Sequence, residues 1–278
     1  MNHKSLHLTR WSLLKRLISQ TLKLLLIFYV LICVVLYFFQ EKLLFFPDKL
    51  EHNYSFSFPQ PFEELNITTQ AGTSINGLLF KSDSTKGLVF YLHGNAGSLA
   101  NWGDVAKRYT DLHYSVFILD YPGYGKSEGS IHSKTQLFDA IQVAYDQMKQ
   151  LFGEESIVVV GYSIGIGPAV YLASTNHPKL LILQAPYYSL TDMMRHTYPV
   201  IPIFLSKYTF QTHAYLKDCK MTIVIFHGDR DEVIYYSSAL KLKSEFKTGD
   251  ILITLKAQGH NGITDNSDYI SAIQYVLR

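Results

Sequence analysis

The chain has 278 residues, enough for one sizeable globular domain and a short additional segment. Only 17% of the residues are charged, the formal net charge is +2, and no run of lysine and arginine resembles a nucleic-acid groove, so DNA and RNA are not expected partners. The two cysteines, Cys33 and Cys219, are too few for a disulfide framework. Neither Cys-x-x-Cys pairs nor His-Glu-x-x-His occur, so the sequence implies no metal and no other cofactor.

The first predicted element is a membrane-spanning helix over residues 22–39. Its only charge is Lys23, near the N-terminal end, and Tyr29 and Tyr37 resemble interfacial aromatic residues. At 1.5 Å per residue this helix is about 27 Å long, close to the roughly 30 Å hydrocarbon core of a bilayer. A buried core helix is the alternative, but such helices rarely lack a polar face over this length.

A cleaved signal peptide is the second alternative, because Lys15 and Arg16 precede the apolar run. The residues after the run are bulky or charged and contain no small-residue cleavage site, which favours an uncleaved anchor. Basic residues are more frequent before the helix, with Lys4 and Arg10 in addition to the pair above, than after it. The positive-inside rule therefore predicts that residues 1–21 are cytoplasmic and that the rest of the chain lies on the extracytoplasmic side.

Residues 40–61 are predicted to form a connector, and residues 62–278 to form the folded domain. A β-hairpin is expected first, and it is followed by near-continuous apolar runs typical of strands buried on both faces. Amphipathic helical patterns alternate with these runs, which predicts an α/β fold with a mostly parallel sheet flanked by helices. Ligands bind at the C-terminal ends of such strands. The expected strands are 65–68, 75–80, 88–93, 115–120, 156–160, 180–185, 222–227 and 251–255, and the clearest helices are 133–151, 236–246 and 264–277.

Ser163 is the candidate nucleophile. It lies in Gly-Tyr-Ser-Ile-Gly, directly after the predicted strand 156–160 and before a helical pattern. Gly161 and Gly165 lack side chains that would collide in a sharp turn, so the serine oxygen would be exposed above the sheet. An ordinary tight turn between a strand and a helix is the alternative.

A nucleophilic serine needs a base, and His260 follows the last predicted strand. The base in turn needs a carboxylate that orients the imidazole and stabilises its charged form. Asp229, Asp231 and Glu232 all follow the preceding strand, and composition alone does not choose among them. A polar surface loop is the alternative for this segment.

The loop 93–97, His-Gly-Asn-Ala-Gly, ends the first long strand of the domain. Its glycines would let the backbone approach a ligand closely, so the amides of Asn95 and Ile164 are predicted to form an oxyanion hole. A loop of ordinary turn residues is the alternative. Neither this loop nor residues 123–127 match G-x-x-x-x-G-K-[ST], which argues against a nucleotide site.

Five motifs, in this order, closely resemble the α/β-hydrolase superfamily over about residues 62–278; they are residues 93–97, 120–127, 161–165, 227–233 and 259–261. The resemblance implies the α/β-hydrolase fold and a catalytic triad of Ser163, Asp231 and His260, since the family acid falls in His-Gly-x-x-Asp-x-Val. It also implies Asn95 as the first oxyanion donor. Gly262 departs mildly from the commoner Asp after His-Asn. Within the superfamily the chain resembles a membrane-anchored, single-pass branch related to protein depalmitoylases and uncharacterised bacterial serine hydrolases.

The cap segment, residues 185–220, interrupts the pattern of strands and helices and includes the apolar run 198–210. It is expected to pack as a helix against the sheet, to form an apolar wall for an acyl chain, or to make a second contact with the bilayer.

The function expected from the resemblance is hydrolysis of a carboxylic ester or thioester with a hydrophobic acyl group, through an acyl-enzyme on Ser163. The partner would be a small or lipid-like acyl ester. A serine peptidase or aminopeptidase of the same fold is an alternative, although no acidic cluster is clearly placed to bind a substrate amine. A non-catalytic binding protein is another, disfavoured because all three triad positions are intact. The oligomeric state is left open.

Overall fold

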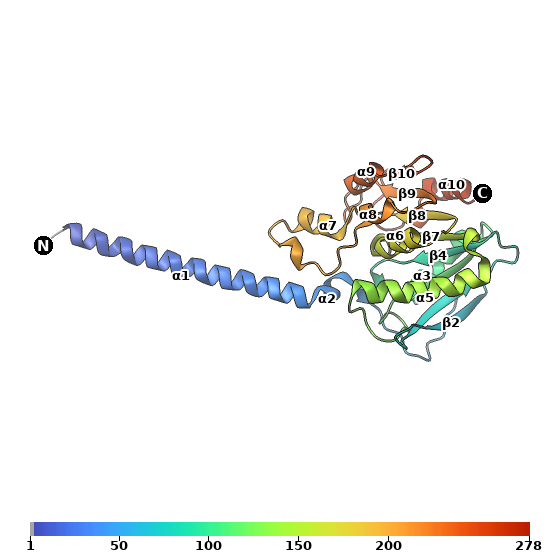
Figure 1. The fold of residues 1–278 in the computed structure, drawn as a ribbon, viewed down its shortest axis with the longest axis horizontal. Helices are drawn as coiled ribbons and strands as arrows, with labels where there is room; N and C mark the ends of the chain where they lie inside the picture. The colour runs from blue at the N-terminus through green and yellow to red at the C-terminus, as the bar shows by residue number, and fades with distance from the viewer. Residues whose placement is uncertain (1–2) are drawn as a thin grey trace.

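A computed structural model describes residues 3–278, and for residues 3–10 it describes the backbone alone. The side chains of Lys4 and Arg10, part of the predicted basic N-terminus, therefore lie outside the described residues. Helix α1 (His3–Phe38) is continuous and projects from the rest of the molecule as a single rod (Figure 1). Its part from Trp11 to Phe38 contains an 18-residue stretch with a mean hydropathy of 2.5, and none of that stretch is buried, so its length and composition suit a membrane span.

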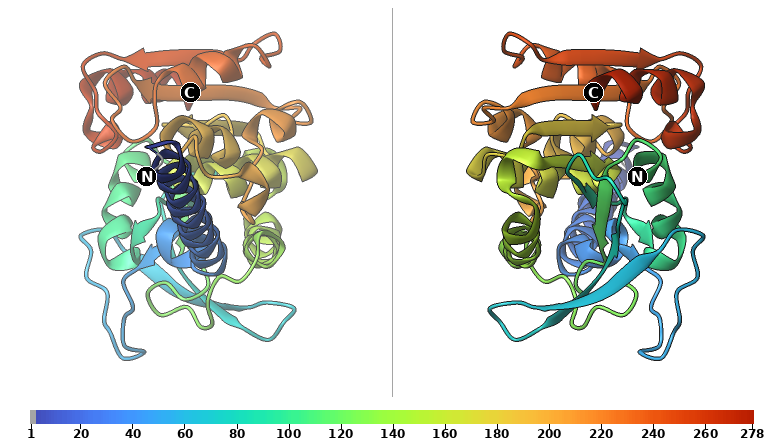
Figure 2. Two further views of the ribbon diagram at one scale, coloured as in Figure 1. Left: turned by 90° about the vertical axis from the view of Figure 1, so that its left-hand side faces the viewer. Right: turned by 90° about the vertical axis from the view of Figure 1, so that its right-hand side faces the viewer.

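The core of the molecule is an eight-stranded sheet with the order β10-β9-β8-β7-β4-β6-β3-β2 (Figure 2). The six strands from β10 to β6 are mutually parallel, and the β2–β3 hairpin joins β6 in antiparallel orientation at one edge. All residues of β4, β6, β7 and β8 are buried, which explains their unbroken apolar sequences. The predicted mostly parallel sheet is confirmed. The strands are β2 Phe62–Thr68, β3 Ser74–Phe80, β4 Leu88–Leu92, β6 Ser115–Leu119, β7 Ile157–Tyr162, β8 Leu180–Gln184, β9 Thr222–Gly228 and β10 Ile251–Leu255.

Helices cover both faces of the sheet, because alternate residues of each strand point to opposite sides. One apolar cluster joins one face of the strands to α5, α6, α8 and α9, and a second cluster joins the other face to α3, α4 and α10. The predicted helix patterns correspond to α5, α6, α9 and α10. The helices that cover the sheet are α3 Leu99–Trp102, α4 Ala106–Thr110, α5 Lys134–Phe152, α6 Ile166–Thr175, α8 Thr212–Leu216, α9 Ser237–Lys243 and α10 Ser267–Val276, with the 3₁₀ turns Gly103–Val105, Glu154–Ser156 and Ile263–Asp265.

The cap segment follows β8 and contains α7 (Leu190–Thr197) and the 3₁₀ turn η4 (Ile203–Leu205) before α8. Ser189 begins α7 as an N-cap, since its hydroxyl accepts a hydrogen bond from the amide of Asp192. The cap lies on the side of the domain from which α1 projects (Figure 1). There the ring of Tyr208 packs edge-on against Phe45, with 5.3 Å between ring centroids.

The segment predicted as a connector has regular structure of its own. It forms the short helix α2 (Gln40–Leu44) and the two-residue strand β1 (Phe46–Pro47). Strand β1 pairs in parallel with β5 (Ala96–Gly97), which lies directly after Asn95. The chain that leaves α1 is therefore hydrogen-bonded to the loop at the C-terminal end of β4.

Candidate active site

Ser163 lies in a sharp turn between β7 and α6. It begins the 3₁₀ turn η3 (Ser163–Gly165) and has a φ of +53°, in the left-handed region that a residue with a side chain rarely adopts. A Cβ atom at Gly165 would collide with the backbone carbonyl of Leu92, so only glycine fits there. Backbone strain of this kind persists only where the surrounding packing enforces it, and it occurs preferentially at functional sites.

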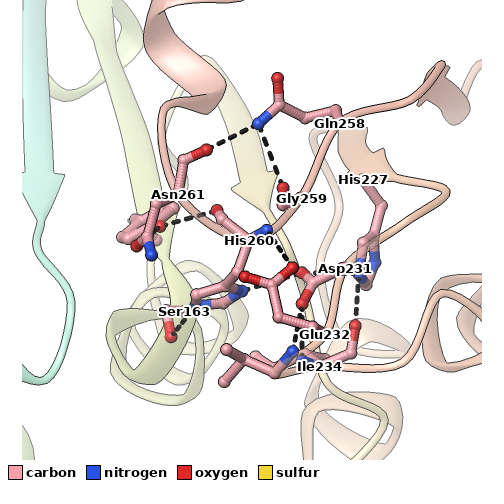
Figure 3. Close-up of polar contacts among 11 residues, drawn as sticks. Ser163, His227, Asp231, Glu232, Ile234, Gln258, Gly259, His260 and Asn261 are labelled. Atoms are coloured by element: carbon pink, nitrogen blue, oxygen red, sulfur yellow. Dashed lines mark hydrogen bonds and ion pairs between the residues drawn. The ribbon is translucent and has the colours of Figure 1, made fainter.

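The structure brings Ser163, His260 and Asp231 together from the ends of three different strands (Figure 3). The Nε2 atom of His260 lies 3.0 Å from the Ser163 Oγ atom. Its Nδ1 atom lies 2.8 Å from the Oδ2 atom of Asp231. An ionised carboxylate can only accept, so Nδ1 carries the proton and Nε2 is left to accept from the serine hydroxyl. This is the arrangement that general-base activation of a serine requires.

Asp231 is held by several donors besides the histidine. Its Oδ1 atom accepts from the amides of Val233, at 2.9 Å, and Ile234, at 2.7 Å. His227 Nε2 lies 3.2 Å from Oδ2. Burial raises the pKa of Asp231, but hydrogen bonds from His227 and His260 outweigh it and hold the pKa well below its usual range. The carboxylate is therefore ionised at neutral pH and can stabilise an imidazolium.

The two neighbouring carboxylates have other partners. Asp229 accepts from the amide of Ala257 at 2.7 Å, and Glu232 accepts from the backbone amide of His260 at 3.2 Å. Of the three carboxylates left open by the sequence pattern, Asp231 is the one whose oxygen meets the imidazole. Glu232 instead holds the backbone of the histidine loop.

Three consecutive carbonyl groups of the loop at the end of β4 have hydrogen-bond partners. The carbonyl of His93 accepts from the Tyr121 hydroxyl at 2.8 Å, and that of Gly94 lies 2.7 Å from His93 Nδ1. The carbonyl of Asn95 accepts from the amide of Phe46 at 2.8 Å. Within the described chain, the amide of Asn95 has no hydrogen-bond partner. The hydrogen bonds to its carbonyl groups thus hold the loop in place, and the amide of Asn95 remains available as a donor.

Comparisons with known proteins agree with this fold. Residues 87–200 match the family model of the alpha/beta hydrolase fold. Protein bem46 of Schizosaccharomyces pombe is 26% identical over 212 residues, which cover 70% of this chain and 71% of that protein. Human alpha/beta hydrolase domain-containing protein 17B is 27% identical over 237 residues, which cover 82% of this chain and 79% of that protein.

Solved structures show the same architecture. An esterase of Pyrococcus furiosus superposes with a TM-score of 0.67 at 17% identity, and the match covers 84% of this chain and 97% of the esterase. An esterase of Exiguobacterium antarcticum superposes with a TM-score of 0.60 at 18% identity, over 77% of this chain and 99% of that one. The chain has the α/β-hydrolase fold, and these similarities support its membership of that superfamily. Its coarse class is accordingly a hydrolase, and the predicted superfamily and fold are confirmed.

Two buried ionisable side chains, His93 and Asp120, lie at the base of the loop 93–97. Burial lowers the pKa of His93 to about 4. Burial also raises the pKa of Asp120 to about 8, partly opposed by a hydrogen bond from the amide of Leu99. At neutral pH both side chains are therefore mainly uncharged, so the loop rests on a polar but neutral support.

Two supports of the site in this α/β-hydrolase were not assigned from sequence. His227 donates toward Asp231, and the Tyr162 hydroxyl donates to the backbone carbonyl of His260 at 2.9 Å. Tyr162 lies inside the motif 161–165 and His227 inside the motif 227–233, which is the only signal that the sequence offers for them. Within the described part of the chain, no group of three or more histidine, cysteine or acidic side chains is arranged to hold a metal ion.

Proposed function

We propose that the protein is a serine hydrolase that cleaves a carboxylic ester or thioester through an acyl-enzyme on Ser163. The observation that supports this most directly is the hydrogen-bonded series from Ser163 through His260 to Asp231. The amides of Asn95 and Ile164 are the proposed oxyanion donors. The esterases among the similar structures are compatible with this reaction class.

The first half of the proposed reaction forms the acyl-enzyme. As the Ser163 oxygen attacks the substrate carbonyl, His260 Nε2 takes the hydroxyl proton and Asp231 stabilises the resulting imidazolium. The negative charge that develops on the carbonyl oxygen is met by the two backbone amides, each of which is typically worth about 10²–10³ in rate. The bond to the leaving alkoxide or thiolate then breaks, and that group receives the proton from His260.

The second half releases the acid. A water molecule loses a proton to His260 Nε2 as its oxygen attacks the acyl carbonyl. The ester bond to Ser163 breaks, and the serine oxygen recovers its proton from the imidazolium. The products are a carboxylic acid and an alcohol or thiol, and no cofactor takes part in this scheme.

We further propose that α1 anchors the enzyme in a membrane, with residues 1–21 in the cytoplasm and the catalytic domain, residues 62–278, on the extracytoplasmic side. In this proposal residues 22–39 cross the bilayer and residues 40–61 connect them to the domain, with residues 185–220 as a cap. Support comes from the apolar, unburied surface of α1 and from the basic residues that precede its apolar part.

A fluorophosphonate probe tests the chemistry, because it reacts with a serine only when that serine is activated. We expect the full-length protein in detergent to be labelled, and Ser163→Ala to lose the label. Ser174→Ala is the matched control, since this hydroxyl only donates to a carbonyl of its own helix. A folded wild-type protein that neither reacts with the probe nor cleaves p-nitrophenyl acetate would contradict the proposal.

A further inference from the structure

A cavity of about 590 Å³ lies between the end of α1, helix α2 and the cap. Its walls are mainly aliphatic, and none of the described residues that line it is charged. This volume falls within the roughly 300–1,000 Å³ of typical small-molecule sites. Leu36, Leu43 and Leu44 line it on the anchor side, and Met193, Met194 and Ile201 on the cap side.

Several polar side chains at the cavity wall already have partners. The Gln40 amide group donates to the carbonyl of Leu205 at 2.6 Å, and its oxygen accepts from the amide of Lys207 at 2.9 Å. The Tyr208 hydroxyl donates to Glu41 at 3.1 Å. These contacts close the cap onto α2, and the polar groups that make them are not available to a polar ligand. The cavity therefore suits an uncharged, apolar occupant.

The cap tip, residues 198–205, lies beside the apolar part of α1 rather than beyond its end. The Tyr29 hydroxyl donates to the carbonyl of Val200 at 2.7 Å. Tyr29 precedes the end of α1 by nine residues, which corresponds to about 13 Å along the helix. If α1 spans a bilayer, the cap tip reaches the depth of the lipid acyl chains.

The surface and the backbone of the cap tip suit that depth. Residues 197–206 contain no charged side chain, and Val200 and Phe204 are 73% and 81% exposed. Large exposed apolar groups of this kind mark contact surfaces. The amides of Ile201 and Leu205 donate within the cap. Such internal hydrogen bonds reduce the cost of placing irregular backbone next to lipid.

The inner wall of the cavity packs on the same apolar cluster as the nucleophile turn. Leu44, Leu190 and Met193 pack against the apolar cluster that contains Ile164, the residue after the nucleophile. The Tyr187 hydroxyl, near the start of the cap, donates to the carbonyl of Ile164 at 3.3 Å. Helix α2, the cap and the nucleophile turn therefore share one apolar core.

We infer that this cavity binds a single long acyl chain that enters from the bilayer beside α1. The inference rests on the proposed function and names its substrate class: an ester or thioester whose apolar chain stays at the membrane while its carbonyl reaches Ser163. The site is built by Leu36 near the end of the anchor, by α2 and by the cap, so the end of the anchor contributes to substrate binding as well as to location.

Photo-crosslinking with a lipid tests the site. Full-length Ser163→Ala protein is placed in phosphatidylcholine vesicles that contain a small fraction of phosphatidylcholine with a diazirine near the end of one acyl chain. After illumination, the modified residues are mapped by mass spectrometry. We expect cross-links on Met193 of the cap in addition to those on α1.

Two tryptophan variants show whether the cavity itself is needed. Met194→Trp is expected to lower cross-linking at Met193 about fivefold or more. The indole would occupy part of the cavity, and the close-packed side chains around it cannot move far enough to make new room for the acyl chain. Leu240→Trp, an exposed position on α9, should leave it unchanged. Cross-links confined to α1, or found on Phe204 but not on Met193, would overturn the inference. The Ser163→Ala background removes any dependence on turnover, so failure here is distinct from failure of fluorophosphonate labelling in the wild-type protein.

Discussion

At the scale of single residues, the site combines one strained backbone position with a strongly polarised side-chain series. Ser163 adopts a positive φ in the turn between β7 and α6, and the carbonyl of Leu92 leaves room only for glycine at Gly165. Asp231 is ionised because donors surround it, and this charge orients His260. The catalytic roles of these residues are predictions. The assignment of Asp231, rather than a neighbouring carboxylate, as the catalytic acid can be tested with a pair of variants.

We expect Asp231→Asn to lower kcat by about 10³–10⁴, because the amide cannot hold Nδ1–H of His260 in the required tautomer. Asp229→Asn is the matched control, and it should stay within about threefold of wild type because the asparagine oxygen can still accept from the amide of Ala257. Both values are measured with p-nitrophenyl acetate, with thermal unfolding to show that each variant is folded. A larger loss in Asp229→Asn would assign the acid to that residue.

At the scale of elements, the two-residue strand β1 is the least expected contributor to the site. It pairs with β5, and the amide of Phe46 donates to the carbonyl of Asn95. The amide of the same residue is a proposed oxyanion donor. The Tyr124 hydroxyl reaches the same carbonyl at 2.7 Å. A segment immediately after the anchor thus acts as a positioning element for the loop.

Removing the hydrogen bond from β1 should weaken catalysis with little effect on binding. Phe46→Pro deletes the donor, and we expect kcat to fall about tenfold with KM nearly unchanged, since small displacements of a catalytic group are costly. Phe46→Ala keeps the amide and removes only a half-exposed side chain, so its kcat should be close to that of wild type. Equal losses in kcat for the two variants would show that the Phe46 side chain, rather than its backbone amide, matters.

At the scale of the whole molecule, the C-terminal ends of the central strands, the cap and the exit from α1 share one side of the domain (Figure 1). The proposed active site is therefore close to the point where the chain leaves the anchor. For a membrane-bound enzyme this geometry favours substrates that are themselves held at the membrane. Which side of the membrane that is depends on the orientation of α1.

Reporter fusions at the C-terminus test the orientation. Alkaline phosphatase is active only outside the cytoplasm, and we expect it to be active when fused to the C-terminus. The reason is that the basic residues Lys15, Arg16 and Lys23 keep the N-terminal end of α1 in the cytoplasm. Changing Lys15 and Arg16 together to glutamate should increase the share of reversed molecules. A wild-type fusion that is active only with a cytoplasmic reporter would reverse the proposed topology.

Much of this protein could be predicted from its sequence. Buried parallel strands need unbroken apolar runs, and the helices between them need amphipathic patterns, so the order of elements and the location of Ser163 and His260 at strand ends follow from local patterns. The sequence pattern does not predict the short helices α3 and α4, because segments of four or five residues are too short to show a helical period.

Only the tertiary structure decided which groups meet across long sequence separations. It placed Asp231, rather than Asp229 or Glu232, against the imidazole of His260, which is the choice that the family resemblance implies. It also revealed the pairing of β1 with β5 and the contact between Tyr29 and Val200. Hydrophobic periodicity reports which face of an element is buried, whereas these contacts depend on how distant elements are arranged in space, and a single sequence holds no local signal for that arrangement.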